Sequence, residues 1–124
     1  MRKIDVAFLS IIILAALIIP ISLVVSHQQT KTDTIAIDAR IGEDGGWSVK
    51  TIHAKVGEDL VLKLESQDVM HSFVIDELNI NVSLYPGHVV YVHIPTDKAG
   101  TYTYYCGIYC SPRHFGMSGT LYIE

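Results

Sequence analysis

Residues 88–124 read HVVYVHIPTDKAGTYTYYCGIYCSPRHFGMSGTLYIE, and their pattern indicates strands rather than helices. Apolar and polar side chains alternate over residues 88–94, which is the period of a half-buried strand. Residues 100–106 and 120–124 are rich in β-branched and aromatic side chains, which favour strands. The prolines and glycines between these runs are typical of turns. We therefore expect three strands here, with a loop at residues 107–119.

The chain upstream of this stretch continues the same pattern. Short β-forming runs are separated by Gly, Pro and Asp, and no sustained helical period occurs after Val25. In the run 59–65, alternate leucines share one face. Together with the three strands expected in residues 88–124, the predicted strands number seven or eight. This number favours a β-sandwich or a Greek-key barrel. The upstream strands are expected at residues 34–39, 49–55, 59–65, 72–76 and 80–84.

The loop after the strand at 100–106 carries four side chains that can bind a metal. Cys106, Cys110, His114 and Met117 follow the spacing C-x3-C-x3-H-x2-M, and His71 lies upstream in the run DVMHSF. Thiolate, imidazole and thioether ligands together favour copper over magnesium, calcium or manganese. Cys110, His114 and Met117 with an upstream imidazole would make a mononuclear blue-copper site. The additional thiolate of Cys106 would let both sulfurs bridge two copper ions, a centre suited to electron transfer.

Three other uses of these residues remain open. Two cysteines in an oxidising compartment most often form a disulfide, and cysteine count alone favours that pairing. A Cys2His2 zinc site is possible, but it leaves Met117 without a role. Thiol–disulfide enzymes usually carry C-x-x-C in a βαβ setting, which this sequence lacks. A disulfide does not explain the spacing of His114 and Met117, so we favour copper.

These motifs closely resemble the CuA domain of subunit II of haem-copper (cytochrome c) oxidases. The matching segments are DVMHSF at 68–73, NINVSLYPG at 79–87 and CGIYCSPRHFGM at 106–117, followed by Gly119-Thr120. The resemblance covers roughly residues 52–124. It implies an all-β, cupredoxin-like Greek-key β-barrel. The short chain and single apolar segment are more similar to the compact subunit II of B-type oxidases than to the form with two membrane helices.

The resemblance also implies a ligand set, a cofactor and partners. Cys106 and Cys110 would bridge two copper ions, and His71 and His114 would each bind one of them. Met117 and the backbone carbonyl of Ile108 would be the weak ligands. Such a subunit accepts electrons from cytochrome c or a small blue-copper protein. It passes them to the haem of subunit I, where dioxygen is reduced.

Two departures from the family pattern concern single residues. Many members carry Glu where Ile108 stands, and that carboxylate helps to bind magnesium, which Ile108 cannot do. The family's aromatic cluster for electron entry is represented here only by Trp47. A single Trp in a β domain is more often part of the core.

An apolar N-terminal segment precedes the predicted domain. Residues 6–25 contain no charged side chain, and as a helix they would reach roughly 30 Å, the thickness of the hydrocarbon core. Arg2 and Lys3 precede the segment, so the N-terminus is expected in the cytoplasm and the rest outside. A cleaved signal peptide is the alternative, but its apolar region is usually shorter. We expect a membrane anchor at 1–26, a linker at 27–33 and the copper domain at 34–124.

Composition excludes some other functions. The chain carries 13 acidic and 9 basic residues among 124. Without residues 1–26, which hold Asp5, Arg2 and Lys3, 12 acidic and 7 basic side chains remain. Nucleic-acid binding requires clustered basic residues, so it is not expected. The alternatives to an oxidase subunit are a stand-alone tethered copper carrier, a copper-delivery or thiol-redox protein, and a structural β domain.

Several further residues have simpler expected roles. Asp68 is expected to orient His71 by hydrogen bonding or to cap a turn. Arg113 is expected as an exposed loop charge or a partner contact. Phe73 and Phe115 are expected to shield the copper or to lie in the core. Four histidines lack ligand spacing and are expected at the surface or in loops: His27, His53, His88 and His93.

Overall fold

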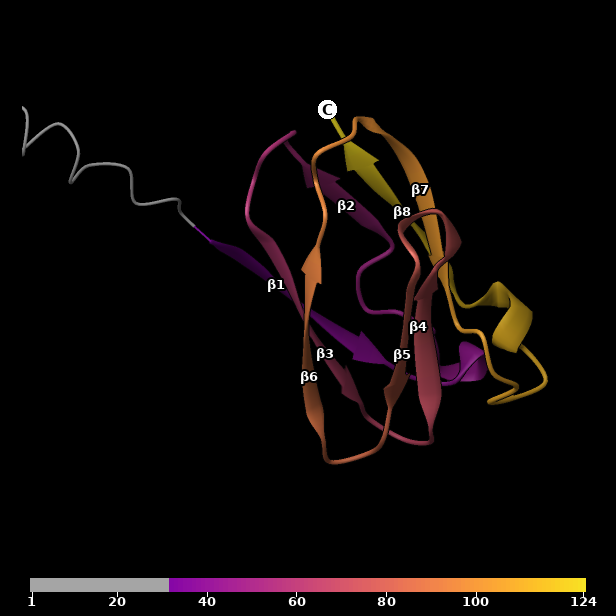
Figure 1. The fold of residues 1–124 in the computed structure, drawn as a ribbon. Coiled ribbons are helices and arrows are strands. Elements are labelled where there is room, and N and C mark those ends of the chain that lie inside the picture. Colours follow the sequence, from indigo (N-terminus) through magenta and orange to yellow (C-terminus); the bar gives the residue numbers. More distant parts are fainter. Residues whose placement is uncertain (1–31) are drawn as a thin grey trace, which may run out of the picture. The chain divides into compact units, whose positions relative to one another are not determined.

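The computed structural model describes residues 32–124, and the proposed anchor and most of the linker lie outside them. No helix in this range is long and apolar enough to cross a membrane. Eight strands and three short 3-10 turns make up the described chain (Figure 1). The strands are β1 (Asp33–Ala39), β2 (Thr51–Ala54), β3 (Leu60–Ser66), β4 (His71–Ile75), β5 (Ile80–Leu84), β6 (Val89–Ile94), β7 (Gly100–Tyr105) and β8 (Ser118–Ile123). The turns are η1 (Gly42–Asp44), η2 (Asp76–Leu78) and η3 (His114–Gly116).

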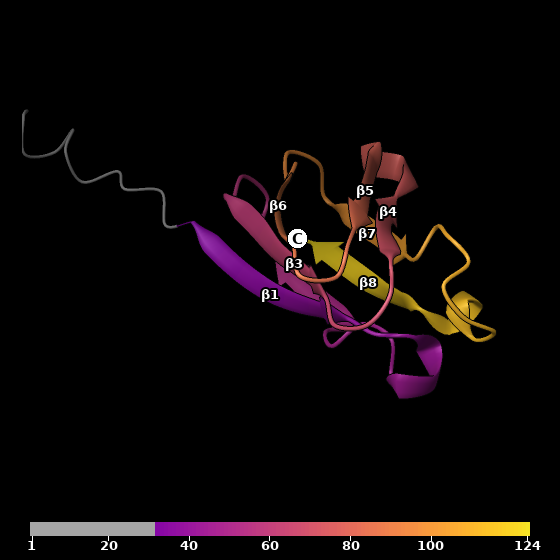
Figure 2. The same ribbon diagram turned by 90° about the horizontal axis from the view of Figure 1, so that it is seen from below.

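The strands form two sheets that pack face to face. The smaller sheet has the order β1-β3-β6, and the larger has the order β2-β8-β7-β4-β5. Both sheets are mixed, because β1 pairs with β3 and β2 with β8 in parallel, whereas the other ladders are antiparallel. Figure 2 shows the small sheet on one side and β4, β5, β7 and β8 on the other. The expected all-β fold is confirmed, and the named ladders join its strands into two sheets rather than one closed barrel.

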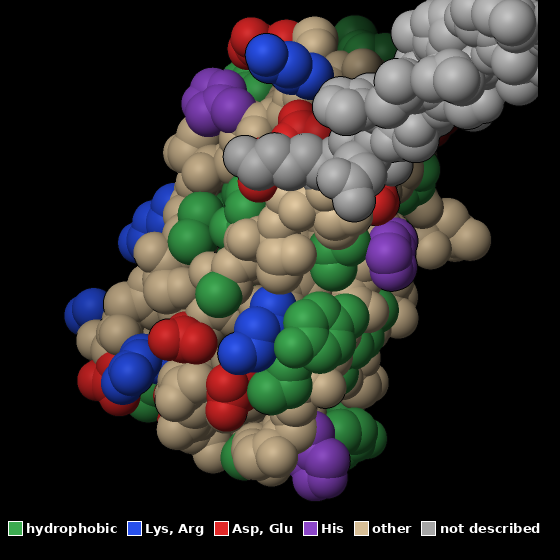
Figure 3. Space-filling view, turned by 90° about the vertical axis from the view of Figure 1, so that its left-hand side faces the viewer, with side chains coloured by type: hydrophobic (Ala, Val, Ile, Leu, Met, Phe, Trp, Pro, Cys, Tyr) green, Lys and Arg blue, Asp and Glu red, His purple; other side chains and the backbone are tan. Residues whose placement is uncertain are grey.

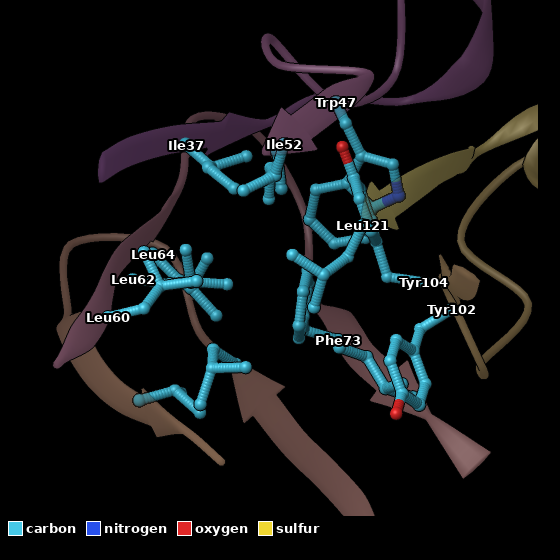
Figure 4. Close-up of a cluster of buried hydrophobic side chains, with 14 of the residues drawn as sticks. Ile37, Trp47, Ile52, Leu60, Leu62, Leu64, Phe73, Tyr102, Tyr104 and Leu121 are labelled. Atoms are coloured by element: carbon cyan, nitrogen blue, oxygen red, sulfur yellow. The ribbon is translucent and has the colours of Figure 1, made fainter. Parts of the chain in front are cut away.

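The core lies between the sheets and follows the predicted alternation. Leu60, Leu62 and Leu64 of β3 all face inward and are buried, as expected. On β6, Val92 and Ile94 are buried, whereas Tyr91 and His93, which alternate with them, are exposed. Figure 4 shows these leucines opposite an aromatic group from the larger sheet. Burying such a layer of large apolar side chains is the main stabilising contribution to the domain.

An aromatic cluster fills the end of the core nearest the predicted metal loop. The rings of Trp47 and Phe73 meet edge-on at 5.4 Å, and Phe73 stacks on Tyr104 at 5.2 Å. The Tyr104 hydroxyl donates a hydrogen bond of 2.6 Å to the Val49 carbonyl. Gly119 of β8 lies directly against the Tyr104 ring. Trp47 is therefore core, with 1% of its surface exposed.

The surface carries charges of both signs. On the side of the small sheet, acidic and basic side chains are interspersed with histidine and apolar groups (Figure 3). Nucleic-acid binding would require a concentrated basic patch. This face therefore offers no such patch, in keeping with the acidic composition.

The close approach of Gly119 to Tyr104 gives a test of this packing. A methyl group at position 119 would overlap the ring, which cannot move away within a filled core. We expect Gly119→Ala to lower the free energy of unfolding of the metal-free chain by about 1–3 kcal/mol. Gly116→Ala is the matched control, because a Cβ there meets no heavy atom within 4 Å. Urea unfolding would measure both, and equal stabilities would contradict the packing described.

Candidate metal centre

Two neighbouring strands bring the predicted ligands to one end of the sandwich. His71 is the first residue of β4, and Cys106 directly follows β7. Both strands belong to the larger sheet, where they pair antiparallel. Cys110, His114 and Met117 come from the loop between β7 and β8, which we call the ligand loop (residues 106–117). In Figure 1 this loop lies beside η1 at the right-hand end of the molecule.

The sulfur atoms form a compact group. Cys106 Sγ lies 3.8 Å from Cys110 Sγ, and Cys110 Sγ lies 3.4 Å from Met117 Sδ. The Ile108 carbonyl oxygen is 3.3 Å from Cys106 Sγ. Both cysteines are free within residues 32–124, and their separation far exceeds a disulfide bond of about 2.05 Å. The ligand loop therefore places three sulfurs and a carbonyl oxygen in a row of neighbouring donor atoms.

His71 completes a three-ligand cluster with the two thiols. Its ring is fully buried, and Nδ1 lies 3.9 Å from Cys106 Sγ. The ligand atoms of His71, Cys106 and Cys110 all lie within 4.8 Å of one another. One metal ion could contact all three of them. The chemistry of this donor set favours a soft thiophilic metal such as copper or zinc.

His114 is not part of that three-ligand cluster, but its ring nitrogen lacks a partner. Nδ1 is buried and accepts or donates no hydrogen bond within residues 32–124. Its ring contacts Phe115 at 4.1 Å and Tyr109 at 5.3 Å between centroids. A buried polar atom without a partner is costly, and a metal ion would satisfy it. The fit of these residues to a metal ion therefore rests on His71, Cys106 and Cys110, and His114 Nδ1 is an additional buried donor.

Asp68 fixes the orientation of His71. The His71 Nε2–H donates a hydrogen bond of 2.7 Å to Asp68 Oδ1, because an ionised carboxylate can only accept. Asp68 Oδ1 also accepts from Val69 N, and Oδ2 from Ile41 N, each at 2.6 Å. This network leaves Nδ1 as the ring nitrogen that faces the sulfurs. Of the two roles expected for Asp68, the orientation of His71 is confirmed.

Electrostatics favour a single thiolate in the metal-free site. Burial opposes ionisation of Cys106, but hydrogen bonds to His71 and to the backbone of Ser72 and Ile108 lower the pKa of its thiol. Burial, together with the charge on Cys106, raises the pKa of Cys110. Thiolates are the metal-binding form of cysteine. Loading the site would therefore release a proton from Cys110.

Opposing effects also act on the pair Asp68–His71. Burial raises the pKa of Asp68, but hydrogen bonds from His71 and from two backbone N–H groups lower it overall. Burial lowers the pKa of His71, but the hydrogen bonds to Cys106 and Asp68 raise it overall. The folded state therefore stabilises ionised Asp68 and protonated His71.

Other predicted residues lie away from the sulfurs. His53, His88 and His93 are exposed, as expected, and His27 lies outside the described residues. Arg113 is exposed on the ligand loop. Phe73 is in the core. The expectation for Phe115 is wrong, because its side chain is 86% exposed and neither shields the sulfurs nor joins the core. The chain turns through η3 at this point, which directs residue 115 outward.

Sequence reasoning missed the contribution of residues 41–47 to the site. The Trp47 Nε1–H donates a hydrogen bond of 3.1 Å to the Met117 carbonyl, 70 residues away. A Cβ at Gly46 would lie 3.3 Å from Met117 Cγ, and a Cβ at Gly42 would clash with the Arg113 carbonyl. The only available signal was the glycine-rich run GEDGGW at 42–47, which is also typical of an ordinary surface loop.

Comparison with known proteins identifies the family and its fold. The model of the cupredoxin-like domain matches residues 11–121. Cytochrome c oxidase subunit 2 from Thermus thermophilus is 34% identical over 79 residues, which cover 64% of this chain and 58% of that protein. This chain therefore matches little more than half the length of that relative.

Solved structures agree on the fold. One chain of a heme-copper terminal oxidase dimer superposes with a TM-score of 0.65 at 20% identity, covering 99% of this chain and 100% of that one. The periplasmic domain of subunit II of cytochrome oxidase from Bradyrhizobium japonicum gives 0.60 at 14% identity, covering 73% and 83%. At these identities the likeness concerns the fold alone.

The Asp68 network predicts a defined pH dependence in the metal-free chain. Asp68→Asn removes the carboxylate that three donors share, so we expect a loss of about 1–3 kcal/mol of unfolding free energy. The stabilisation from the lowered pKa of Asp68 is lost as pH falls through that pKa. The stabilisation from the raised pKa of His71 is lost as pH rises through that one. The unfolding free energies of wild type and variant should therefore differ most at pH values between the pKa of Asp68 and the pKa of His71.

Urea unfolding across the pH range would measure this difference. Asp97→Asn is the control, because Asp97 is exposed on the turn between β6 and β7. A gap between wild type and Asp68→Asn that stays constant with pH would contradict the network.

Proposed function

The chain belongs to the cupredoxin-like domain family, and from this premise we propose that it is the electron-accepting copper subunit of a haem-copper oxidase. The observation that carries the proposal is the pair of cysteine sulfurs 3.8 Å apart, one of them facing His71 and the other facing Met117. A mononuclear site needs only one such thiolate. The second thiolate supports a binuclear centre of the CuA type.

We assign the ligands residue by residue. Cys106 and Cys110 would bridge two copper ions, and His71 and His114 would each bind one through Nδ1. This assignment accounts for the nitrogen of His71 that faces Cys106 and for the nitrogen of His114 that has no partner in the described part of the chain. Met117 Sδ and the Ile108 carbonyl are the remaining donors near the sulfurs. They would act as weak ligands.

Bound copper would supply a one-electron redox couple. The protein's part is to hold the donors still and to keep water away from them. The Cys106 N–H donates to the Met117 carbonyl at 3.1 Å, which ties the two ends of the ligand loop together. The Gly107 N–H donates to Ser72 Oγ at 2.9 Å, which fixes the start of the loop to β4. Preorganised, buried donors reduce the rearrangement that accompanies electron transfer.

The oxidase role and the membrane anchor are parts of the same proposal. Electrons would enter from cytochrome c or a small blue-copper protein and leave to the haem of a separate subunit I. The relative from Thermus thermophilus, itself named a cytochrome c oxidase subunit, supports this role. Residues 6–25 would anchor the chain, with the copper domain outside the cytoplasm. The Ile108 side chain offers no donor for magnesium, so we propose no magnesium site at that position.

Copper content and electron paramagnetic resonance (EPR) test the centre directly. The purified full chain would be reduced, loaded with copper and dialysed against a chelator. We expect two copper ions per chain and one unpaired electron shared over both nuclei. One copper with a single-nucleus pattern would overturn the binuclear assignment in favour of a blue-copper carrier. No retained copper would overturn the electron-transfer function altogether.

A single substitution tests the second thiolate. Cys106→Ser should abolish the shared-electron pattern, because the serine hydroxyl cannot supply a bridging thiolate. His93→Ala is the control, since His93 is exposed on β6 and should leave both copper ions in place. A Cys106→Ser variant that kept the wild-type spectrum would exclude Cys106 as a ligand.

A further inference from the structure

A loop from outside the ligand motifs lies against several residues of the site. We call residues 41–47 the brace; they include η1 and lead from β1 toward β2. The brace reaches His71 through the hydrogen bond from Ile41 N to Asp68. It reaches the residue before His114 through Gly42, which packs on Arg113. It reaches Met117 through Gly46 and Trp47. One loop is therefore in contact with the supports of three proposed ligands.

The brace is held in shape by its own backbone. Gly46 N donates to the Ile41 carbonyl at 3.2 Å, and Arg40 N donates to the Gly46 carbonyl at 3.0 Å. Gly46 adopts a φ of 71°, which favours glycine. Ala39 and Trp47 form an antiparallel bridge that fastens the loop to β1. These contacts are independent of the ligand loop, so the brace can act as a fixed surface against which that loop is positioned.

Trp47 makes the most specific of these contacts. The Met117 carbonyl accepts two hydrogen bonds, from Trp47 Nε1 and from Cys106 N, both at 3.1 Å. The first is a buried side-chain contact, and the second closes the ligand loop. With its carbonyl held from two directions, Met117 keeps Sδ 3.4 Å from Cys110 Sγ. The indole ring also lies 6.4 Å from the His71 ring, between centroids.

We propose that Trp47 is a positioning residue for the copper centre, which fixes the weak ligand Met117 through the hydrogen bond from its indole N–H to the Met117 carbonyl. The copper part of this inference rests on the proposed function, whereas the placement of Met117 does not. The axial thioether tunes the reduction potential of a copper–thiolate site. A loosened thioether donates less to Cu(II), so the potential should rise when the indole N–H is lost.

A matched pair of variants separates positioning from ordinary core packing. Trp47→Phe keeps an aromatic ring but removes the N–H that reaches Met117. Tyr104→Phe removes a hydroxyl that hydrogen-bonds the Val49 carbonyl in the same aromatic cluster. Each variant loses one hydrogen bond from an aromatic side chain to a backbone carbonyl. Of the two carbonyls, only that of Met117 belongs to a proposed ligand.

The first measurement needs no metal. The chain has three methionines, so a label on the methionine methyl carbons gives three resonances, and Met117→Leu assigns the one from residue 117. In the metal-free full chain, Trp47→Phe should shift the Met117 methyl resonance and Tyr104→Phe should leave it in place. An unmoved resonance in Trp47→Phe would overturn the proposal, whether or not the chain binds copper.

The second measurement uses the copper-loaded full chain. Trp47→Phe should raise the reduction potential and change the copper hyperfine splitting. It should also release copper to a chelator roughly fivefold faster, the factor that one lost buried hydrogen bond gives. Tyr104→Phe should match wild type in all three. Equal behaviour of the two variants would overturn the positioning role. Failure of wild type to bind copper would overturn the proposed function instead, and the methyl measurement would still decide the placement of Met117.

Discussion

The backbone hydrogen bond from Cys106 N to the Met117 carbonyl is the contact on which the site depends. It joins the residue after β7 to the residue before β8, and these two strands are antiparallel neighbours in the larger sheet. The ladder therefore continues for one more bond and then opens into the ligand loop. A loop closed at its base has fewer conformations to lose when its side chains converge. The sheet thus determines where the sulfurs lie before any metal is present.

Most of the fold could be predicted from sequence, because it depends on local patterns, and the spacing of cysteine, histidine and methionine side chains indicated a metal-binding loop. The Ile108 carbonyl entered the proposed ligand set only through the family resemblance. Alternation with a period of two identified the strands, and the inward leucines of β3 lie where that alternation puts them. The brace could not be predicted, since its contacts join residues 27 or more positions apart and its glycines fit a surface loop equally well. Phe115 was misjudged for a related reason. Hydrophobicity indicates burial, but the direction of a side chain in a loop depends on turns such as η3 that no periodicity reveals.

The metal-free site retains unfavourable features that the binding of a metal ion would relieve. Among residues 32–124, His114 Nδ1 is buried without a partner, and a second thiolate at Cys110 is opposed by burial and by Cys106. In an ordinary core such features are selected against, because buried polar groups need partners. Here both occur within the ligand loop. Their coincidence is the physical reason to regard the ligand loop as a site and not as an irregular turn.

The two imidazoles, His71 and His114, differ in the number of contacts that hold them in place. His71 is fully buried, begins a strand and is held by a carboxylate that itself accepts two backbone N–H groups. His114 is only partly buried, lies in a single turn of 3-10 helix and contacts the exposed rings of Tyr109 and Phe115. Stability varies across a structure with such differences in packing. The His71 side of the centre is therefore the fixed side. A metal ion could enter the centre from the His114 side. A partner protein could also approach most closely on that side.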